Sequence, residues 1–551
     1  MYKYDNYDHE MVQQRVNQFR DQTNRYLNGK LTDSEFLPLR LQNGLYIQRL
    51  APMLRIAVPY GLYNSTQLRK LAEISRKYDK GYIHVSTRQN FQLNWPKLED
   101  VPDILEELAS VEMHAIQTSG NCIRNTTTDQ YAGVAVDEIE DPRPWCELIR
   151  QWSTFHPEFA LLPRKFKIAV CASNEDRTAF QFHDIGVELI HDTNKETKFN
   201  IFVGGGLGRT PVISQLIKKN LHWKHLITYL EAILRVYNQL GRRDNKYKAR
   251  IKILVKALGA NEFAKKVEKE WSFIKDNDNT LDEEALEYVK RFFIASHYEK
   301  LNDQECNKKL SSKRFESKEF NNWVEKNILP HQKSGYCIVN LSLKPTGIAP
   351  GDISDYQMDA IADLADKYSN GILRNTHQQN IVLADVKKSD LFEIWESCKL
   401  LGLATPNLGH LSDPICCPGG DYCALANAKS IPIAEAIQRL FDDIDYLYDL
   451  GPIDLNISGC MNACGHHHVG HIGILGVDKK GKEFYQISLG GNMSRNASIG
   501  KILGPSFSQD EIPNIINKIL TVYVKERQEE EIFIDTYQRI GIKPFKEFVY
   551  G

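Results

Sequence analysis

The chain repeats one pattern twice, and this duplication limits the folds that are open to it. Asn64 and Ser65 offer caps to a helix with apolar residues at helical spacing, and Lys77–Gly81 follows before a strand-like segment. The same order begins again at Ser354, where a second helix pattern leads to Lys367–Gly371 and another strand-like segment. We therefore expect two copies of a strand–helix–strand unit.

A second pair of landmarks supports the duplication. Gly204 lies 123 residues after Gly81, and Gly490 lies 119 residues after Gly371, each at the end of a similar apolar segment. A repeat of this length indicates a duplicated pair of domains and not a solenoid. Each copy should therefore contain the strand–helix–strand unit followed by a larger mixed α/β unit.

Charge and composition exclude several classes of partner. The formal net charge is −2, so we expect no nucleic-acid or membrane partner. The N-terminus is polar, unlike a signal peptide, and no apolar run approaches the ~18 residues of a membrane span. We expect a cytoplasmic protein with three to four domains of roughly 150 residues each. In a reducing cytoplasm, cysteines that cluster more often bind metal or do chemistry than form disulfides.

Five of the 11 cysteines lie between Cys416 and Cys464. Two pairs stand out, Cys417-x5-Cys423 and Cys460-x3-Cys464, and the first is too wide for a common zinc ribbon. Four thiolates suit a [4Fe–4S] cluster, and we expect the flanking glycines to let the chain wrap closely around it. Buried thiols without metal are the alternative, and Cys416 is expected to be structural.

The second cysteine pair lies in Gly459–Gly465, which reads Gly-Cys-Met-Asn-Ala-Cys-Gly. Together with the C-x5-C pair, this segment resembles the fingerprint of the sirohaem-containing sulfite and nitrite reductases. The resemblance extends from about Gln42 to Gly504 and includes the duplication. It implies a [4Fe–4S] cluster bound by four cysteines, and a sirohaem whose iron takes the last of them as its axial ligand. In this chain the four are Cys417, Cys423, Cys460 and Cys464.

The resemblance implies an α+β fold with internal duplication, the pseudo-twofold sulfite/nitrite reductase fold. It has two ferredoxin-like half-domains and two larger mixed α/β domains that hold sirohaem and cluster. The expected limits are an N-terminal extension at 1–40, the first half-domain at 41–110, the first sirohaem- and anion-binding domain at 111–263, a helical connector at 264–334, the second half-domain at 335–403, and the second α/β domain with the cluster cysteines at 404–551.

Several basic residues of the first copy lie in or beside apolar strand patterns, where charges are rarely left unpaired. The segment from Tyr82 to Gln92 alternates with period two, so we expect His84, Ser86, Arg88 and Gln92 to share one face of a strand. Lys165 and Lys167 are likewise expected on one side of a strand, with Phe166 opposite. A site for a polycarboxylate and an anionic substrate needs such groups. A solvated surface charge is the alternative for any one of them.

The resemblance assigns roles to these residues. It implies that the substrate anion is bound by Arg55, Arg124, Lys165 and Lys167. Contacts to sirohaem are implied for His84, Arg88, Gln92 and Asn462, and we add Asn125, Arg250 and Lys252 as cofactor-binding candidates. Position 84 is arginine in some relatives, so the His84 contact is expected to be weaker or pH-dependent.

The second copy lacks these charges. Where the first copy has Thr87-Arg88-Gln89, the second has Thr376-His377-Gln378, a pairing that slips by one residue from the neighbouring landmarks. We expect one active site per chain, with the basic residues of the first copy facing the cysteines of the second. His466–His468 and His471 suggest a polar lid over the cluster, with a second metal site as the alternative, because adjacent histidines in a strand chelate poorly.

The resemblance implies six-electron reduction of sulfite to sulfide. Lys165-Phe166-Lys167 favours sulfite, because plant-type nitrite reductases tend to have asparagine at the second lysine. Assimilatory nitrite reduction to ammonia is the alternative, and a non-catalytic iron–sulfur protein is the distant one. The glycines at 204–206 do not complete a dinucleotide fingerprint and no flavin motif is present, so an external ferredoxin or flavoprotein is expected as electron donor. Some relatives join a cysteine placed like Cys122 to a tyrosine placed like Tyr46, and we keep that cross-link as a hypothesis.

Overall fold

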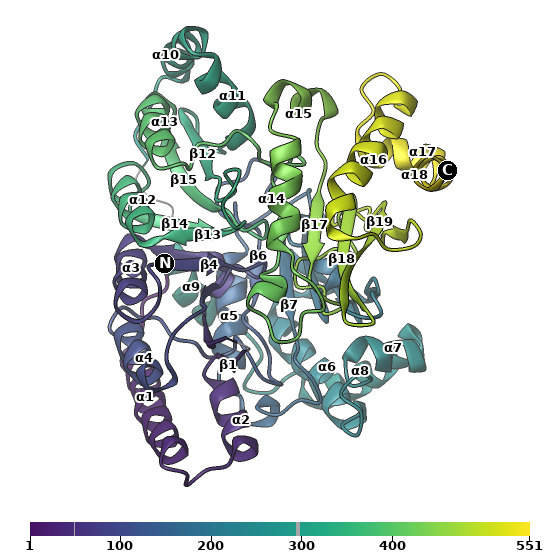
Figure 1. Cartoon of the computed structure of the whole chain (residues 1–551). Coiled ribbons are helices and arrows are strands. Elements are labelled where there is room, and N and C mark those ends of the chain that lie inside the picture. The colour runs from purple at the N-terminus through teal and green to yellow at the C-terminus, as the bar shows by residue number, and fades with distance from the viewer. Residues whose placement is uncertain (49, 294–297) are drawn as a thin grey trace.

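The computed structural model describes residues 1–48, 50–293 and 298–551. Within these residues the strands form four five-stranded sheets, which make two equivalent pairs (Figure 1). The first half-domain has the strand order β1-β2-β5-β4-β13, and the second has β11-β12-β15-β14-β3. The strands are β1 (Leu45–Ile47), β2 (Pro52–Ile56), β3 (Leu62–Asn64), β4 (Tyr82–Val85), β5 (Phe91–Leu93), β11 (Ile328–Pro330), β12 (Tyr336–Leu341), β13 (Asp352–Ser354), β14 (Ile372–Asn375) and β15 (Ile381–Lys387).

The two half-domains exchange an edge strand. β13 of the second copy pairs with β4 of the first, with Asp352 opposite His84, and β3 of the first copy pairs with β14 of the second. Each exchanged strand leads directly into a helix, α3 (Ser65–Tyr78) or α12 (Asp355–Tyr368), and the two helices pack together. The halves therefore share one core and are not two independent domains.

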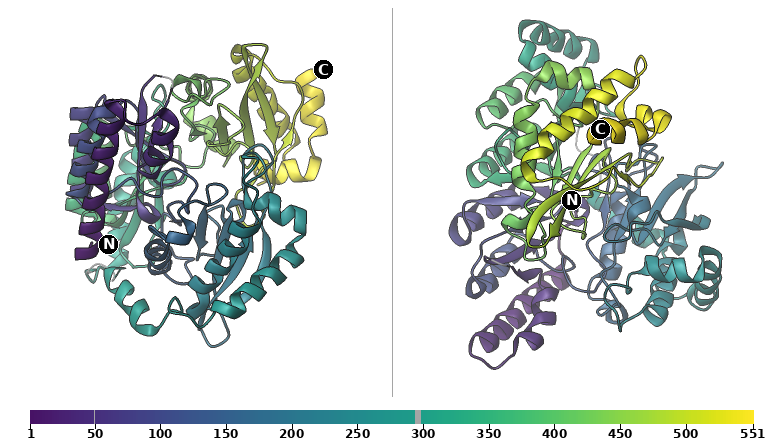
Figure 2. Two further views of the ribbon diagram at one scale, coloured as in Figure 1. Left: turned by 90° about the horizontal axis from the view of Figure 1, so that it is seen from below. Right: turned by 45° about the vertical axis from the view of Figure 1, so that its right-hand side comes forward.

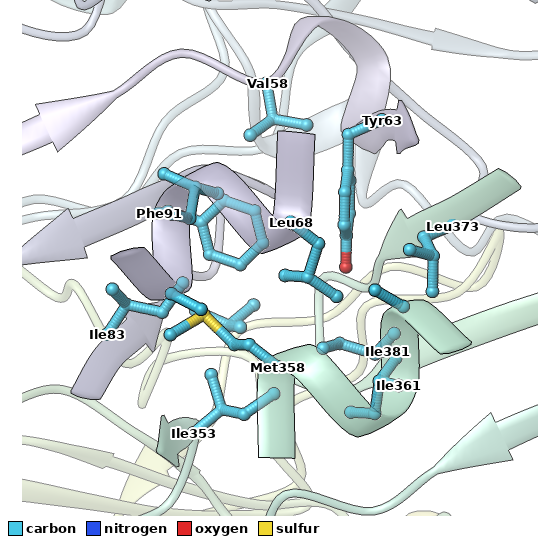
Figure 3. Packing of buried hydrophobic residues seen from close by; sticks show 14 of the residues in the cluster. Val58, Tyr63, Leu68, Ile83, Phe91, Ile353, Met358, Ile361, Leu373 and Ile381 are labelled. Carbon is cyan, nitrogen blue, oxygen red and sulfur yellow. The ribbon is translucent and has the colours of Figure 1, made fainter. Parts of the chain in front are cut away.

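The shared core is apolar and drawn from both copies. Figure 3 shows Leu68 of α3 and Met358 of α12 directed toward one another, with Ile83 and Phe91 beside them. All of these side chains are buried, and full burial of such a side chain stabilises a fold by about 1.5–3 kcal/mol. The second half of the chain thus fixes the sheet that carries Arg55 and Gln92.

The helices of this pair begin where the sequence predicts. Asn64 accepts a hydrogen bond from the amide of Gln67, and the Gln67 side chain accepts one in return from the amide of Asn64. Ser354 and Gln357 form the same capping box at α12. Two outward-facing arginines of α3 form ion pairs with aspartates of α12, among them Arg69 with Asp363 at 2.6 Å and Arg76 with Asp359 at 2.7 Å.

Each large domain has a mixed sheet covered by helices. The first has the order β10-β9-β8-β7-β6 and the second β16-β17-β18-β19-β20. Figure 2 shows the C-terminal helices, in yellow, packed beside the second of these sheets. The first sheet contains β6 (Thr127–Thr128), β7 (Ile168–Cys171), β8 (Ile185–His191), β9 (Thr197–Val203) and β10 (Gln215–His222), with helices α5 (Arg143–Ser153), α6 (Leu226–Leu240), α7 (Ile251–Leu258) and α8 (Ala260–Ile274). The second contains β16 (Ile415–Cys416), β17 (Leu455–Ser458), β18 (Ile472–Lys479), β19 (Lys482–Leu489) and β20 (Lys501–Ile502), with helices α14 (Ile431–Leu440), α15 (Ile444–Leu450), α16 (Ile512–Glu526), α17 (Phe533–Ile540) and α18 (Lys543–Tyr550).

The remaining helices lie outside this frame. The N-terminal residues form α1 (Asn6–Leu27) and α2 (Asp33–Gln42), and α1 packs on α4 (Val101–Ala109) of the first half-domain. The expected connector contains α9 (Glu283–Lys290), α10 (Asp303–Glu316) and α11 (Lys318–Asn327), and α13 (Leu391–Leu400) belongs to the second half-domain. Among the described residues, no helix is long and apolar enough to span a membrane. The domain limits given above remain a prediction.

One expected strand is wrong. The segment from Tyr82 to Gln92 is a hairpin, in which Ser86–Asn90 is a turn between β4 and β5. The Ser86 amide donates to the Asn90 carbonyl at 2.8 Å, and Gln89 has a positive φ of 60°. Period-two alternation continues across such a short turn, so the pattern alone does not reveal the reversal.

The hairpin also corrects the pairing of the two copies. The second copy has the same turn, with a bond of 2.9 Å from the Thr376 amide to the Asn380 carbonyl and a φ of 63° at Gln379. Ser86 therefore matches Thr376 and Gln89 matches Gln379, at the same offset of 290 residues that relates Gly81 to Gly371. The expected slip is absent. The counterpart of Arg88 is Gln378, which is uncharged.

Candidate active site

A row of polar residues crosses the first half-domain sheet. Arg55 of β2 lies opposite Gln92 of β5, and Gln92 lies opposite His84 of β4. Directly opposite residues project from the same face of a sheet, so these three share one face. The guanidinium of Arg55 donates two hydrogen bonds to Oε1 of Gln92, at 2.9 and 2.6 Å. The sheet thus fixes the direction of Arg55.

His84 is held by the second copy. Its Nδ1 lies 2.7 Å from Oδ1 of Asp352, and its Nε2 lies 3.1 Å from Nε2 of Gln379. Both ring nitrogens therefore have partners in the protein. The predicted contact between His84 and sirohaem stays a prediction, and in this arrangement neither nitrogen is free to make it.

Arg88 projects from the hairpin turn toward the first large domain. Its guanidinium donates to the Asn125 carbonyl at 2.7 Å and lies 2.7 Å from Nε2 of His183. Asn125 in turn donates to the Val58 carbonyl and to Oδ1 of Asn90. Burial, reinforced by Arg124, lowers the pKa of Arg88 to about 9, which shows how unfavourable its charge is here without an anion.

Lys165 and Lys167 come just before β7, and Phe166 between them is buried in the core, as the alternation predicts. Burial, followed by the nearby charge of Arg124, lowers the pKa of Lys165 to about 8. Burial, followed by the charge of Arg88, holds the pKa of Lys167 well below its usual range. Cations crowded together in this way favour the binding of an anion.

Three other predicted cations have partners in the protein. Arg124 donates to the carbonyls of Thr118 and Gly120, each at 2.7 Å. Arg250 donates twice to Oδ1 of Asp184, at 2.9 and 2.7 Å. Lys252 is buried and donates to backbone carbonyls at 207 and 210, and burial lowers its pKa to about 8.

Tyr46 lies beside the basic group, which consists of Arg55, Arg88, Arg124, Lys165, Lys167, Arg250 and Lys252. The sequence singled out this tyrosine only for the cross-link. The Arg55 guanidinium lies 5.7 Å from the centre of its ring. Burial opposes ionisation of the phenol, yet Arg124, Arg55 and Lys165 hold its pKa below the usual range. Cys122 donates its thiol to the Ser119 carbonyl at 3.3 Å. Their cross-link stays a hypothesis.

The cysteines lie against the basic group. The hydroxyl of Thr87 donates to the Cys464 carbonyl at 2.9 Å, which joins the first copy's turn to the second copy's cysteine loop. Cys464 is exposed, and the charge of its thiolate opposes the lowering of the pKa of Lys165 and Lys167. The predicted meeting of first-copy cations and second-copy cysteines is therefore present in the structure.

The four predicted cluster ligands influence one another. Burial, followed by the charge of Cys464, raises the pKa of Cys417 to about 12. Burial also raises the pKa of Cys423 and Cys460, and the charge of Cys464 adds to both shifts. The amide of Gly459 donates to Sγ of Cys417 at 3.2 Å. Nowhere in the described residues do three or more His, Cys, Asp or Glu side chains converge on a single ion. A cubane does not need such a site, because each thiolate binds a different iron.

The neighbours of these cysteines have distinct settings. Asn462 is exposed and contacts Cys460, where its hydrogen bonds oppose the upward shift of the Cys460 pKa. Cys416 is buried, and burial holds its pKa well above the usual range, as suits a structural thiol. The expected close approach of the neighbouring glycines to a cluster stays a prediction, and the structure shows a further constraint on them. A Cβ at Gly419 would lie 2.1 Å from Ser430 Oγ, and one at Gly465 would lie 1.9 Å from the Ile457 carbonyl. The glycines thus allow the cysteine loops to pack against their own domain.

The histidines after Cys464 do not form a second metal site among the described residues. His468 Nε2 lies 2.8 Å from the Gly208 carbonyl, and His471 accepts from the Asp454 amide. Burial, with the nearby Lys167, lowers the pKa of His466 to about 3, and burial lowers that of His467 to about 2. Both shifts favour the neutral imidazole at His466 and His467.

The counterpart of the site in the other half is filled by protein. Strand pairing matches Asp129 with Cys417 and Arg177 with Cys464, and these two form an ion pair at 2.7 Å. The face of the second half-domain sheet is covered by Tyr131, whose hydroxyl donates to Oδ1 of Asn340 at 2.9 Å. Asn340 is the counterpart of Arg55. These replacements agree with one active site per chain.

The residues present fit both predicted cofactors. Four soft thiol ligands lie at one edge of the site, which is the donor set that a [4Fe–4S] cluster requires. Among the described residues, Arg55, Arg88, Lys165 and Lys167 have no carboxylate within ion-pairing distance. Such an excess of half-buried positive charge matches a polycarboxylate and a small anion bound together.

Comparisons with known proteins agree with this site. The family described as "Nitrite and sulphite reductase 4Fe-4S domain" matches residues 119–275 and 410–550, and "Nitrite/Sulfite reductase ferredoxin-like half domain" matches residues 48–111 and 331–401. Each matches twice, as the duplication predicts.

Individual relatives cover most of the chain. "Sulfite reductase [ferredoxin] 1" of Mycolicibacterium paratuberculosis is 26% identical over 493 residues, which is 87% of this chain and 81% of that protein. "Ferredoxin--nitrite reductase, chloroplastic" of Arabidopsis thaliana is 27% identical over 501 residues, with 87% and 78% covered. The solved structure of the Mycobacterium tuberculosis NirA protein superposes with a TM-score of 0.77 at 24% identity, covering 94% of this chain and 92% of that one, and it confirms the fold.

These matches account for the two ferredoxin-like half-domains and the two large domains, and the four cysteines stay the predicted cluster ligands. The matches confirm the duplicated α+β fold, and they indicate a [4Fe–4S] cluster and sirohaem as the cofactors of this chain. The chain belongs to the nitrite and sulphite reductase family.

Proposed function

We propose that this chain reduces sulfite to sulfide with six electrons supplied by ferredoxin. The observation that carries the proposal is a set of four cations near the exposed Cys464 that have no carboxylate partner among the described residues, namely Arg55, Arg88, Lys165 and Lys167. The relative from Mycolicibacterium paratuberculosis is named a ferredoxin-dependent sulfite reductase, which favours this substrate and this donor.

The cofactors would be held by both copies of the chain. Cys417, Cys423, Cys460 and Cys464 would hold the [4Fe–4S] cluster, and Arg88, which has no carboxylate partner among the described residues, would bind a carboxylate of sirohaem. When bound, sirohaem and the cluster supply the redox chemistry and deliver electrons singly. Asn125 fixes the turn that carries Arg88, because it bonds to Asn90 in that turn.

The substrate oxygens would be bound by Arg55, Arg124, Lys165 and Lys167. Arg55 is aimed by Gln92, and Arg124 is aimed by the carbonyls of its own loop, so both guanidinium groups are oriented before an anion arrives. Preorganised donors of this kind stabilise negative charge as it develops on departing oxygen.

Lys165 is suited to deliver protons. Its pKa of about 8 lies near neutrality, and a group with such a pKa exchanges protons readily at physiological pH. Anion binding favours its charged form, so the substrate brings its own proton donor into the protonated state. Tyr46 lies among the same cations and is a second candidate donor.

Nitrite is the second candidate substrate. The relative from Arabidopsis thaliana is named a nitrite reductase, and the same cations would bind nitrite. We favour sulfite because Lys167 places an additional cation in the site and sulfite carries more negative charge at neutral pH. A cytoplasmic location remains a prediction.

The test is steady-state turnover of both anions by the purified holoenzyme, with reduced ferredoxin and with a reduced artificial dye as donors. We expect sulfide from sulfite with a higher kcat/KM than ammonia from nitrite. A higher kcat/KM for nitrite than for sulfite would refute sulfite as the preferred substrate and assign nitrite in its place. Turnover with the dye but not with ferredoxin would replace the donor, and a flavoprotein subunit would then be tried.

A further inference from the structure

Gln379 joins three parts of the site that lie far apart in the sequence. It belongs to the hairpin turn of the second copy, and its Nε2 donates to the Val85 carbonyl of the first copy at 3.0 Å. The same nitrogen lies 3.1 Å from Nε2 of His84. Its Oε1 accepts a hydrogen bond of 2.8 Å from the amide of Cys416, the residue before the ligand Cys417.

The duplication supplies a comparison for this residue within the same chain. Gln89 occupies the equivalent position in the first copy, with a φ of 60° against 63° at Gln379. Its Nε2 makes the matching bond to the Asn375 carbonyl at 3.1 Å. Its Oε1, however, is buried and has no hydrogen-bond partner among the described residues. Each glutamine thus makes an equivalent hydrogen bond between the two copies. Of the two side-chain oxygens, only that of Gln379 accepts a hydrogen bond from a cysteine loop.

The polarity of the contacts gives Gln379 a fixed orientation. A carboxylate oxygen of Asp352 faces Nδ1 of His84, so that nitrogen carries the proton and Nε2 is left as an acceptor. The amide nitrogen of Gln379 donates to it, and the amide oxygen is then turned toward Cys416. The side chain is 1% exposed, so water does not compete for these bonds.

This link matters because the site is split. Arg55 and Gln92 belong to the first copy's sheet, whereas the cluster cysteines belong to the second copy's large domain. We propose that Gln379 is a positioning residue for the [4Fe–4S] cluster, which fixes the Cys416–Cys417 segment against the sheet that carries Arg55. The inference rests on the cluster ligands given by the family and deepens the proposed function.

The backbone around Gln379 is built to admit it. A non-glycine residue with positive φ is strained, and such strain is retained where a site requires it. Gly351 lies so close that a Cβ there would come within 3.0 Å of the Gln379 side chain and 3.1 Å of the Val85 carbonyl. Gly61 makes the same room for Gln89.

The test compares Gln379→Leu with Gln89→Leu in the purified holoprotein. Each variant is mixed with an excess of iron chelator, and loss of the cluster is followed by its absorbance and by the electron paramagnetic resonance signal of the reduced cluster. Loss of a partner behind a metal ligand typically lowers metal affinity by about 10–100-fold. We expect Gln379→Leu to lose its cluster at least about tenfold faster than wild type, and Gln89→Leu within about twofold of wild type.

Thermal unfolding separates positioning from general damage. Both variants lose a bond between the copies, and Gln379→Leu also leaves Nε2 of His84 and the Cys416 amide without a partner, so both should lower Tm and Gln379→Leu should lower it more. Only Gln379→Leu should change the resonance signal of the cluster. Equal rates of cluster loss in the two variants, or a wild-type rate in Gln379→Leu, would overturn the proposal. If the leucine variants do not fold, Gln379→Asn and Gln89→Asn give the same comparison, because asparagine keeps the amide, tolerates positive φ and shortens the reach.

The measurement does not depend on turnover. A holoprotein that reduces neither sulfite nor nitrite would refute the proposed function, and its chelation rates would still decide the role of Gln379.

Discussion

Arg250 donates two hydrogen bonds to Asp184, whose other carboxylate oxygen accepts the backbone amide of Lys167 at 2.9 Å. Asp184 is fully buried and is the carboxylate that opposes the lowered pKa of Arg88 and of Lys252. One anion of the protein therefore balances part of the basic group and also fixes the backbone of a substrate-binding lysine.

Replacing this anion should destabilise the protein without its cofactors. Asp184→Asn keeps an acceptor for the Lys167 amide but leaves Arg250 unpaired, and removal of one partner of a buried pair costs about 3 kcal/mol. We expect that loss in the free energy of unfolding, measured by denaturant titration of the apoprotein. Asp244→Asn is the matched control, because Asp244 and its partner Arg242 are both exposed. An equal effect of the two substitutions would contradict the role of Asp184.

Substrate binding should weaken as the pH rises through about 8. Lys165 is protonated below its pKa of about 8 and neutral above it, so its attraction for an anion is lost in that direction. The KM for sulfite in wild type should therefore rise above that pH. In Lys165→Arg the cation stays charged, and this rise should disappear. A pH profile of KM for both proteins, measured under identical conditions, removes the contribution of sulfite's own ionisation.

Lys167→Asn should distinguish the two substrates. The lysine contributes a charged hydrogen bond, which is worth about 1.5–3 kcal/mol, so kcat/KM for sulfite should fall by about 10–150-fold. Nitrite carries less charge and should lose less. Lys248→Asn, which alters an exposed lysine, serves as control. Equal losses for both anions would remove the argument that this residue selects sulfite.

Local patterns in the sequence predicted the duplication, the helix caps and the ligand cysteines, because each depends on residues that are close along the chain. The spacing of Cys417 and Cys423 suggests a pair of cluster ligands, which stays a prediction, and Phe166 between two lysines marks the common side of those lysines. Contacts between distant segments left no such sign. Nothing near Asp352 indicates that its strand joins the sheet of His84, and nothing near Asp184 indicates Arg250 as its partner.

The hairpin at Ser86–Asn90 was missed for a related reason. Its alternation of polar and apolar residues is the same for a straight strand and for two strands joined by a short turn. The turn is shown by the backbone at Gln89, where φ is positive without a glycine. The repeated Gln-Asn pair, at Gln89-Asn90 and Gln379-Asn380, was the available signal, and it also gives the correct pairing of the copies.

The adjacent cysteines Cys416 and Cys417 allow a sharp test of the ligand set. Cys417 Sγ accepts a hydrogen bond from the Gly459 amide, and the charge of Cys464 raises the pKa of Cys417 in addition to the effect of burial. Cys416, in contrast, donates its thiol to the Cys417 carbonyl at 3.3 Å. Serine binds iron less well than a thiolate, so Cys417→Ser should lower bound iron and cluster absorbance, while Cys416→Ser should retain both at wild-type values. Iron analysis of the two purified proteins, with the sirohaem bands recorded separately, provides the measurement. Iron loss in Cys416→Ser with retention in Cys417→Ser would show that Cys416, and not Cys417, is the cluster ligand.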